Sequence, residues 1–242
     1  MKRGMNLHWD GNNSNLEERN LSAAIGAGVT VETADHDSLK RIAEWLGELH
    51  SPRSPHQPDT AAVVRGQAIY QSSCAGCHGR NSTEGYIFDG KMIGQVSPID
   101  EIGTDRRRLD SYTEEFRQLQ LAKLFAGTRY HFKDFKKTNG YANVPLDGLW
   151  LRGPFLHNGS VPTLADLLKP PAQRPKTFLR GLDVIDGVNG GFLSPPCDPS
   201  QRPASGFCFD TSERGNGSGG HVYGVDLPPQ SKADLLAYLL TF

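Results

Sequence analysis

The run Cys74-Ala75-Gly76-Cys77-His78 constrains this chain more than any other feature. At C-x-x-C-H spacing, two thiols can each bond a vinyl group of haem, and the next side chain can bind the iron. A porphyrin is a large flat apolar body, so a chain that holds one must supply apolar walls and a second face over the iron. The sequence therefore predicts one covalently bound haem c, with Cys74 and Cys77 as anchors and His78 as an axial ligand.

Two other chemistries also use a C-x-x-C pair. A structural zinc site needs four ligands, usually as two close pairs, but the remaining cysteines, Cys197 and Cys208, are far downstream and widely spaced. A thioredoxin-like redox pair follows a strand, whereas residues 59–73 have a helical pattern. Zinc binding is the main alternative to haem. In an oxidising compartment Cys197 and Cys208 are expected to form a disulfide, with free thiols as the alternative.

Composition excludes several classes of function. The chain has 242 residues, 37% apolar and 22% charged, with a net charge of −1, which is typical of an ordinary globular protein. A charge near zero gives no general attraction to nucleic acid or anionic membranes. No apolar run is long enough to span a bilayer, and the start Met1-Lys2-Arg3-Gly4 is not followed by the apolar core of a signal peptide. We therefore expect no nucleic-acid partner and no membrane span.

Helical periodicity marks five segments, two of which precede a proline-rich stretch. In the second segment Leu39, Ile42 and Trp45 recur at helical spacing, which predicts that Trp45 is buried in a core. Ser14 is expected to cap the first helix, and Asp37 or Ser38 the second. These five predicted helices span residues 15–25, 38–49, 59–73, 113–125 and 231–241, and Thr163 and Asp166 are expected to cap a further short helix that ends at Leu168.

A proline at every third position of residues 51–58 favours an extended polyproline linker. The linker divides the chain into residues 1–57, a short remnant of an interdomain segment with two helices, and residues 58–242, a larger haem-binding domain. Residues 170–220 are rich in Pro, Gly, Asn and Ser, so little regular structure is expected there. The predicted fold class is mostly α, with long loop insertions and little strand.

The first and last helices of the larger domain are predicted to cross closely. A glycine inside a helix costs about 1 kcal/mol relative to alanine, so Gly66 is expected to admit the helix over 231–241, where Ser231 and Asp234 form a capping pair. Contact between these helices beside a C-x-x-C-H segment resembles the arrangement in c-type cytochromes. Residues 58–242 are therefore expected to form a cytochrome c domain.

Three further segments carry a more specific resemblance. Residues 154–160 read P-F-L-H-N-G-S, Trp9-Asp10-Gly11 lies near the start, and residues 219–224 read G-G-H-V-Y-G. Together they resemble the C-terminal haem domain of the dihaem cytochrome c peroxidase superfamily, and the overall pattern is closest to its rubber-oxygenase-like branch. Around the first segment, the residues expected to contact the haem are Trp150, Arg152, Phe155 and His157.

The resemblance implies a larger protein. In that superfamily W-D-G lies between two haem domains, so Trp9 is expected to relay electrons or to pack between haems. The chain is then the C-terminal part of a dihaem protein that is periplasmic or secreted, with an export signal outside this sequence. Its partner would be the missing N-terminal haem domain or another redox protein. The missing haem is the one at which substrate reacts in the family, so peroxidase or oxygenase activity is not implied for this chain.

The sixth iron ligand is less constrained. The family peroxidases place a methionine soon after the H-N-G motif, but residues 169–172 offer no ligand. Four candidates remain, and they are Met92, His131, His157 and His221. His221 is favoured because it follows the glycine-rich residues 215–220, which can approach a flat cofactor. The resemblance implies that His157 lies at the haem edge without binding iron, with Arg152 nearby as a propionate partner.

The leading function is one-electron transfer through the covalently bound haem c, with His78 and His221 on the iron. The alternative is a haem-dependent peroxidase or oxygenase, in which an open sixth iron position admits peroxide or oxygen. A structural zinc module is the third possibility.

Overall fold

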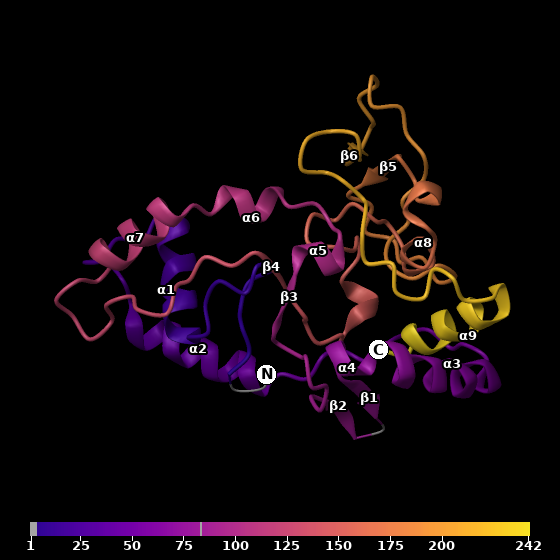
Figure 1. Cartoon of the computed structure of the whole chain (residues 1–242), viewed down its shortest axis with the longest axis horizontal. Helices are drawn as coiled ribbons and strands as arrows, with labels where there is room; N and C mark the ends of the chain where they lie inside the picture. Colours follow the sequence, from indigo (N-terminus) through magenta and orange to yellow (C-terminus); the bar gives the residue numbers. More distant parts are fainter. Residues whose placement is uncertain (1–3, 83) are drawn as a thin grey trace.

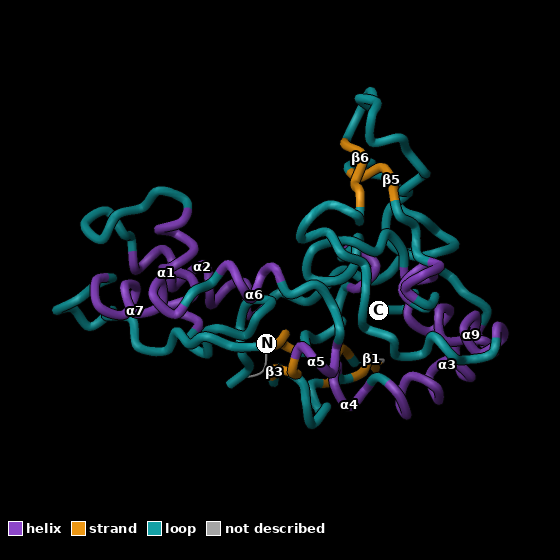
Figure 2. Tube along the Cα trace, turned by 45° about the horizontal axis from the view of Figure 1, so that its top comes forward, coloured by secondary structure: helices purple, strands orange, loops and turns teal. Residues whose placement is uncertain are grey.

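The computed structural model describes residues 4–82 and 84–242 of the chain, and loops connect its short elements (Figures 1 and 2). Helix accounts for 34% and strand for 12%, so the mostly helical prediction is confirmed only in part, since much of the chain is loop. The α-helices among the described residues are α1 (Leu16–Gly26), α2 (His36–Glu48), α3 (Thr60–Ser73), α4 (Ala75–His78), α5 (Ile99–Ile102), α6 (Arg107–Ser111), α7 (Glu114–Lys123), α8 (Leu164–Leu167) and α9 (Pro229–Leu239). Two 3-10 helices, η1 (Leu149–Leu151) and η2 (Pro171–Gln173), complete the helical part.

In the part of the chain that the structure describes, the strands form three small antiparallel pairs. They are β1 (Arg80–Ser82) with β2 (Gly85–Ile87), β3 (Val96–Pro98) with β4 (Gly140–Ala142), and β5 (Thr177–Arg180) with β6 (Phe207–Asp210). The pair β5 and β6 projects from the rest of the molecule (Figure 1). A disulfide joins Cys208, within β6, to Cys197 in the segment between the two strands. The predicted pairing of these cysteines is thus confirmed.

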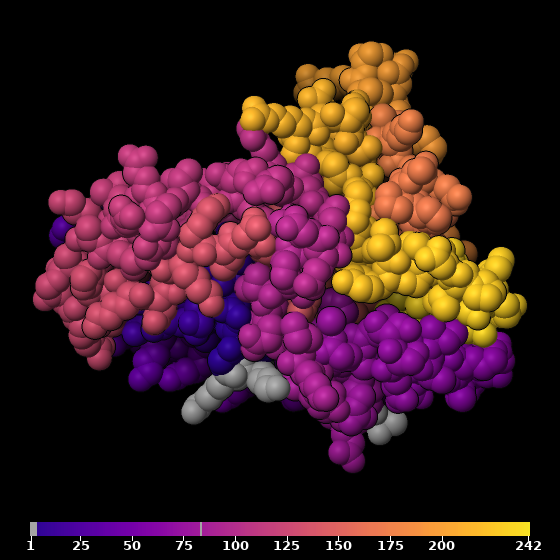
Figure 3. All heavy atoms as spheres, viewed as in Figure 1, coloured from indigo at the N-terminus to yellow at the C-terminus, as the bar shows by residue number. Residues whose placement is uncertain are grey.

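Helices α3 and α9 cross as predicted. A Cβ atom built on Gly66 would lie 1.9 Å from the backbone oxygen of Asp234, so only glycine fits at the crossing. Figure 3 shows α9 lying directly on α3. The predicted capping pair of Ser231 and Asp234 does not form. Helix α9 begins earlier, and the Asp234 carboxylate instead accepts two 2.8 Å hydrogen bonds from Arg65 on α3.

Replacing Gly66 with alanine is expected to destabilise the protein by about 1–3 kcal/mol, the usual range for overpacking a tight contact. The added methyl group meets backbone, which cannot move aside as a flexible side chain would. Chemical denaturation measures the change. Gly47→Ala on α2 is the matched control, because its Cβ meets nothing within 4 Å; this variant should be as stable as the wild type or slightly more stable. Equal effects of the two substitutions would contradict the crossing.

One core lies where α3 meets α9 and includes Tyr70 and Leu235. A second core lies at the other end of the molecule, among α1, α2 and α7 (Figure 1). Leu21 of α1 packs there with four aromatic residues from further along the chain, namely Tyr112, Phe125, Phe132 and Phe135. Residues on both sides of the predicted boundary at 57 therefore share one core. The proline-rich segment also contacts the larger domain, because the Ser54 hydroxyl donates to the Leu240 carbonyl oxygen at 2.5 Å. The division into residues 1–57 and 58–242 stays a prediction.

Details of the first two helices differ from the predictions. The side chain of Asn15, not Ser14, caps α1, and Asp35 caps α2, two residues before Asp37 and three before Ser38. Trp45 is 61% exposed and not part of a core, because α2 packs on its neighbours through Leu39 and turns the rest of its apolar stripe outward. Thr113, by contrast, caps α7 as predicted. Among the described residues, no helix is long and apolar enough to cross a membrane.

Candidate functional site

The C-x-x-C-H segment forms one tight turn at the end of α3. Cys74 ends α3 and begins α4, and its carbonyl oxygen accepts the backbone amides of both Cys77 and His78 at 3.1 Å. The fully buried Tyr70 donates from its hydroxyl to the Gly79 carbonyl oxygen at 2.8 Å, which holds the end of the turn. The two thiols are free and partly buried. This turn presents both sulfur atoms and one imidazole to the same space.

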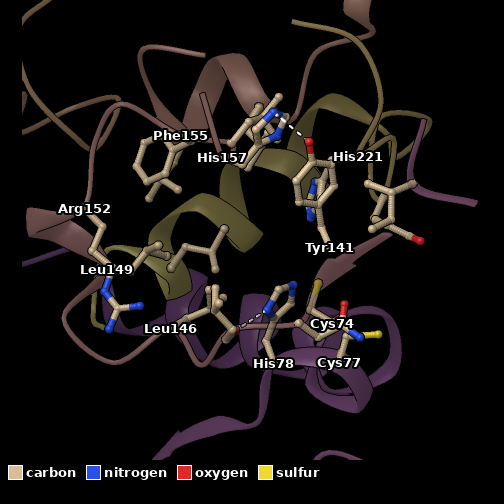
Figure 4. Close-up of a pocket in the computed structure, with 18 of the residues that line it drawn as sticks. Cys74, Cys77, His78, Tyr141, Leu146, Leu149, Arg152, Phe155, His157 and His221 are labelled. Carbon is tan, nitrogen blue, oxygen red and sulfur yellow. Dashed lines mark hydrogen bonds between the residues drawn. The ribbon is translucent and has the colours of Figure 1, made fainter. Parts of the chain in front are cut away.

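That space is a cavity lined mostly by apolar side chains (Figure 4). The centre of a water-sized sphere can occupy about 220 Å³ of it. The apolar lining comes from the turn, from the segment after β4 and from α8 and α9, and includes Leu146, Leu149, Phe155, Leu156, Leu164, Leu168, Leu235 and Leu239. The polar side chains in it are few, which suits a large apolar group with a polar edge.

Two histidines face each other across the cavity (Figure 4). Nδ1 of His78 lies 2.7 Å from the carbonyl oxygen of Val144. A carbonyl oxygen only accepts, so Nδ1 carries the proton and Nε2 is left as a free lone pair, the arrangement that fixes metal-binding histidines. The ring centroids of His78 and His221 are 6.2 Å apart. Two imidazoles on opposite sides of one metal ion would have centroids about 6 Å apart, because each metal–nitrogen bond is about 2.0–2.1 Å.

The residues present fit an iron porphyrin. Nδ1 of His221 is buried without a hydrogen-bond partner, so this nitrogen, unlike Nε2 of His157, is not held by a contact within the protein. Burial lowers the pKa of both imidazoles, that of His221 to about 4, so both are neutral and able to bind metal near neutral pH. Among the described residues, no group of three or more His, Cys, Asp or Glu side chains could hold a bare metal ion. A haem supplies four nitrogen ligands itself, so two histidines suffice.

The thiols are not tuned for redox exchange. Burial raises the pKa of Cys74 to about 11 and also raises that of Cys77. A thioredoxin-like pair needs a thiolate, and therefore a lowered pKa. The environment of the pair thus disfavours thiol–disulfide exchange.

His157 lies in the cavity wall, stacked on Tyr141 with ring centroids 4.2 Å apart. The Tyr141 hydroxyl is 2.6 Å from the carbonyl oxygen of Asp105 and 3.0 Å from Nε2 of His157. Because a phenol has one proton and a carbonyl oxygen can only accept, the hydroxyl donates to Asp105 and accepts from Nε2 of His157. Nε2 of His157 therefore already has a partner within the protein. This contact favours the prediction that His157 lies beside the haem without binding its iron.

The other predicted contacts divide into two groups. Phe155 and Arg152 line the cavity, and Arg152 lies at the end away from the cysteines (Figure 4), with its guanidinium on the Pro145 carbonyl oxygen and the Asp147 carboxylate. Trp150, predicted to contact the haem, is not a lining residue. It lies next to Leu149 on η1, and its indole nitrogen is turned away to donate to the Pro52 carbonyl oxygen at 3.1 Å.

Two of the four candidate iron ligands lie outside the cavity. Met92 is 42% exposed, and Nε2 of His131 contacts the Leu121 carbonyl oxygen at 2.6 Å beside the second core. Trp9 lines the cavity, and 47% of the surface of this residue stays exposed.

Sequence reasoning missed Tyr141 and the buried Arg174, whose guanidinium contacts the loop before His221. The sequence pattern before Arg174 indicated only that no iron ligand is present at residues 169–172.

A pH dependence is expected from His157. Burial lowers its pKa from about 6.5 to about 4, so the unfolded chain binds its proton more tightly than the folded one. Stability from this group is present above pH 6.5 and is lost as the pH falls toward 4. The loss should be on the order of 1–2 kcal/mol after discounting for solvent near this half-buried ring. Denaturation of the wild type and His157→Gln between pH 7 and about 4 measures the difference; parallel curves would contradict it.

Comparisons with known proteins indicate a cytochrome c-like domain. Residues 140–179 match the family model described as RoxA-like, cytochrome c-like. The uncharacterized proteins y4iJ and y4iM of Sinorhizobium fredii (strain NBRC 101917 / NGR234) are similar along most of the chain. The first is 31% identical over 252 residues, covering 80% of this chain and 41% of the relative. The second is 29% identical over 230 residues, covering 84% of this chain and 49% of the relative.

A third similarity is more local. The Cbb3-type cytochrome c oxidase subunit CcoP of Azospirillum brasilense is 27% identical over 82 residues, which is 32% of this chain and 26% of that protein. The chain thus spans less than half the length of the two longer matches. A cytochrome c-like domain implies haem c as its cofactor, in agreement with the C-x-x-C-H turn and its cavity. The chain therefore contains a cytochrome c-like domain, similar over residues 140–179 to the RoxA-like cytochromes.

Proposed function

We propose that this chain binds one haem c covalently and uses it for one-electron transfer. The observation that carries the proposal is the opposed pair of partly buried imidazoles, His78 and His221, across an apolar cavity. Cys74 and Cys77 lie at one end of that cavity. Each thiol adds across one vinyl double bond, with sulfur on one carbon and hydrogen on the other, so attachment needs no oxidant.

When bound, the haem supplies an iron that changes between its ferric and ferrous states by one electron. The residues of the chain hold and insulate it. The Val144 carbonyl oxygen orients His78, Phe155 and the leucines of the wall keep water away, and Arg152 is suited to a propionate at the end opposite the cysteines. Two histidine ligands should give a lower reduction potential than a histidine with a methionine.

The two alternatives have less support. Peroxide or oxygen chemistry needs an open sixth position on the iron, whereas the ring of His221, with its centroid 6.2 Å from that of His78, is suited to fill that position. A zinc module would need ligands beyond Cys74 and Cys77, whereas Cys197 and Cys208 are bonded to each other.

We also propose that the chain acts within a larger dihaem protein, periplasmic or secreted, of the dihaem peroxidase superfamily. Cytochrome c domains are commonly found outside the cytoplasm, and the greater length of y4iJ and y4iM supports a larger whole. The CcoP relative is named as a subunit of a Cbb3-type cytochrome c oxidase, which favours a redox protein or a second haem domain as the partner. Trp9, at the cavity and half exposed, would suit electron exchange with that partner.

A redox titration followed by the visible spectrum tests electron transfer. The protein is produced with export and haem attachment, then reduced and reoxidised with mediators. We expect a single reversible transition of one electron. A haem that cannot be cycled, or one that consumes hydrogen peroxide catalytically at neutral pH, would overturn the proposal in favour of the enzymatic alternative.

A further inference from the structure

The loop that carries His221 has no helix or strand of its own over residues 216–222. His221 has φ +47, in the left-handed region that non-glycine residues rarely adopt, and such a conformation persists only where the surroundings hold it. The His221 amide donates to the Ile102 carbonyl oxygen at 2.8 Å. A Cβ on Gly220 would lie 2.3 Å from the Thr104 nitrogen. The loop is therefore pressed against the segment after α5, as Figure 3 shows.

Arg174 holds the end of this loop. Its side chain is buried, with 3% of the residue exposed. The guanidinium donates to the carbonyl oxygens of Ser218 at 2.6 Å, Gly220 at 2.8 Å and His221 at 3.3 Å. It also donates to the Leu167 and Lys169 carbonyl oxygens at 3.2 Å. One buried cation thus joins the end of α8 to three of the four residues from Ser218 to His221.

The beginning of the loop is held from another side. The Asn158 amide donates to the carbonyl oxygens of Gly215 and Gly217 at 3.0 Å, and the buried Ser160 hydroxyl donates to Gly217 at 3.0 Å. These two residues belong to the P-F-L-H-N-G-S segment. The P-F-L-H-N-G-S segment therefore contacts the beginning of the loop at Gly215 and Gly217, while Arg174 contacts the end of the loop that carries His221.

We infer that Arg174 is a positioning residue for the sixth iron ligand, holding the loop so that His221 stays in place over the iron. This inference rests on the proposed function. A guanidinium suits the task because its five N–H donors spread over several carbonyl oxygens in one plane. Burial lowers the pKa of Arg174, and the negative charge of Asp166 opposes that effect.

If Arg174 holds the loop, removing its guanidinium should change the rate at which an external ligand binds the iron. An external ligand can bind an iron that has two histidine ligands only after one histidine leaves. The saturating rate of cyanide binding to the ferric protein therefore measures how often His221 moves away. A loop that has lost its guanidinium should release His221 more often, even when the folded protein and its attached haem are intact.

The experiment compares Arg174→Met and Arg174→Lys with the wild type and with His221→Ala as the open reference. We expect Arg174→Met to raise the saturating cyanide rate by at least about tenfold, because several hydrogen bonds from a charged donor are lost. Lysine, with fewer donors on a flexible stem, should give an intermediate rate. Arg65→Met is the matched control, since it removes the paired hydrogen bonds to Asp234 and leaves the loop intact; its rate should equal that of the wild type.

The outcomes separate the inference from the proposed function. Wild-type rates in both Arg174 variants, with fast binding in His221→Ala, would overturn the role of Arg174 alone. A His221→Ala protein that binds cyanide as slowly as the wild type would overturn the ligation and the inference with it. If Arg174→Met fails to accumulate with haem, Arg174→Lys decides, because a faster rate supports the role and an unchanged rate contradicts it.

Discussion

A variant with both Cys74→Ser and Cys77→Ser is expected to lose all of its haem when it is denatured and extracted with acidic organic solvent. The wild type should keep its colour on the polypeptide, because two thioether bonds survive unfolding. Each single variant should keep the haem through its remaining thioether. This difference, from complete retention to none, is the largest effect that the site predicts.

The matched control is the other cysteine pair. Cys197 and Cys208 are bonded to each other, with Cys208 on β6, and neither lines the cavity. Replacing both with serine should leave haem retention unchanged. Colour extracted from the wild type, or colour retained by the Cys74 and Cys77 double variant, would contradict covalent attachment at this turn.

His221→Ala is expected to convert the ferric iron from low-spin to high-spin at neutral pH. Alanine cannot reach the iron, and the ring of His157 is held by its contact with Tyr141, so no side chain replaces the imidazole. His221→Met should instead keep a six-coordinate iron and raise the reduction potential, because a thioether ligand raises it.

Two controls accompany that substitution. Met92→Leu and His131→Gln remove the other candidate ligands, which lie outside the cavity, and both variants should keep the wild-type spectrum. An unchanged low-spin spectrum in His221→Ala would remove this histidine from the iron, and a high-spin spectrum in either control would assign the ligand to that residue.

The local features of the fold could be predicted from the sequence. The C-x-x-C-H spacing specifies one turn, and the helical periodicity before it gives α3. The cost of a mid-helix glycine pointed to the crossing at Gly66, where the Asp234 backbone leaves no room for a methyl group. His221 was favoured over three other candidates by the glycines before it. It does lie in the cavity opposite His78, as expected for the sixth ligand.

Orientation within apolar runs could not be predicted. Leu149 and Trp150 are neighbours on one short 3-10 turn, and such neighbours point in different directions, so one lines the cavity and the other does not. Trp45 follows a good helical stripe, but a stripe does not say whether another element covers it.

The hydrogen bonds that hold the His221 loop could not be predicted from the sequence either. Arg174 and Asn158 act through hydrogen bonds to backbone oxygens 44 and 59 residues away. Such contacts between loops follow no periodicity, and their acceptors carry no side-chain signal. Glycine content indicated that chain would approach a cofactor there, without indicating what would hold it.

The electron paramagnetic resonance spectrum of the ferric wild type, at neutral pH and without added ligand, tests the central claim most directly. Histidine ligation from both sides, by His78 and His221, predicts a low-spin ferric signal and no high-spin signal. A predominantly high-spin signal would mean an open sixth position, and would contradict the account of this chain as an electron-transfer cytochrome.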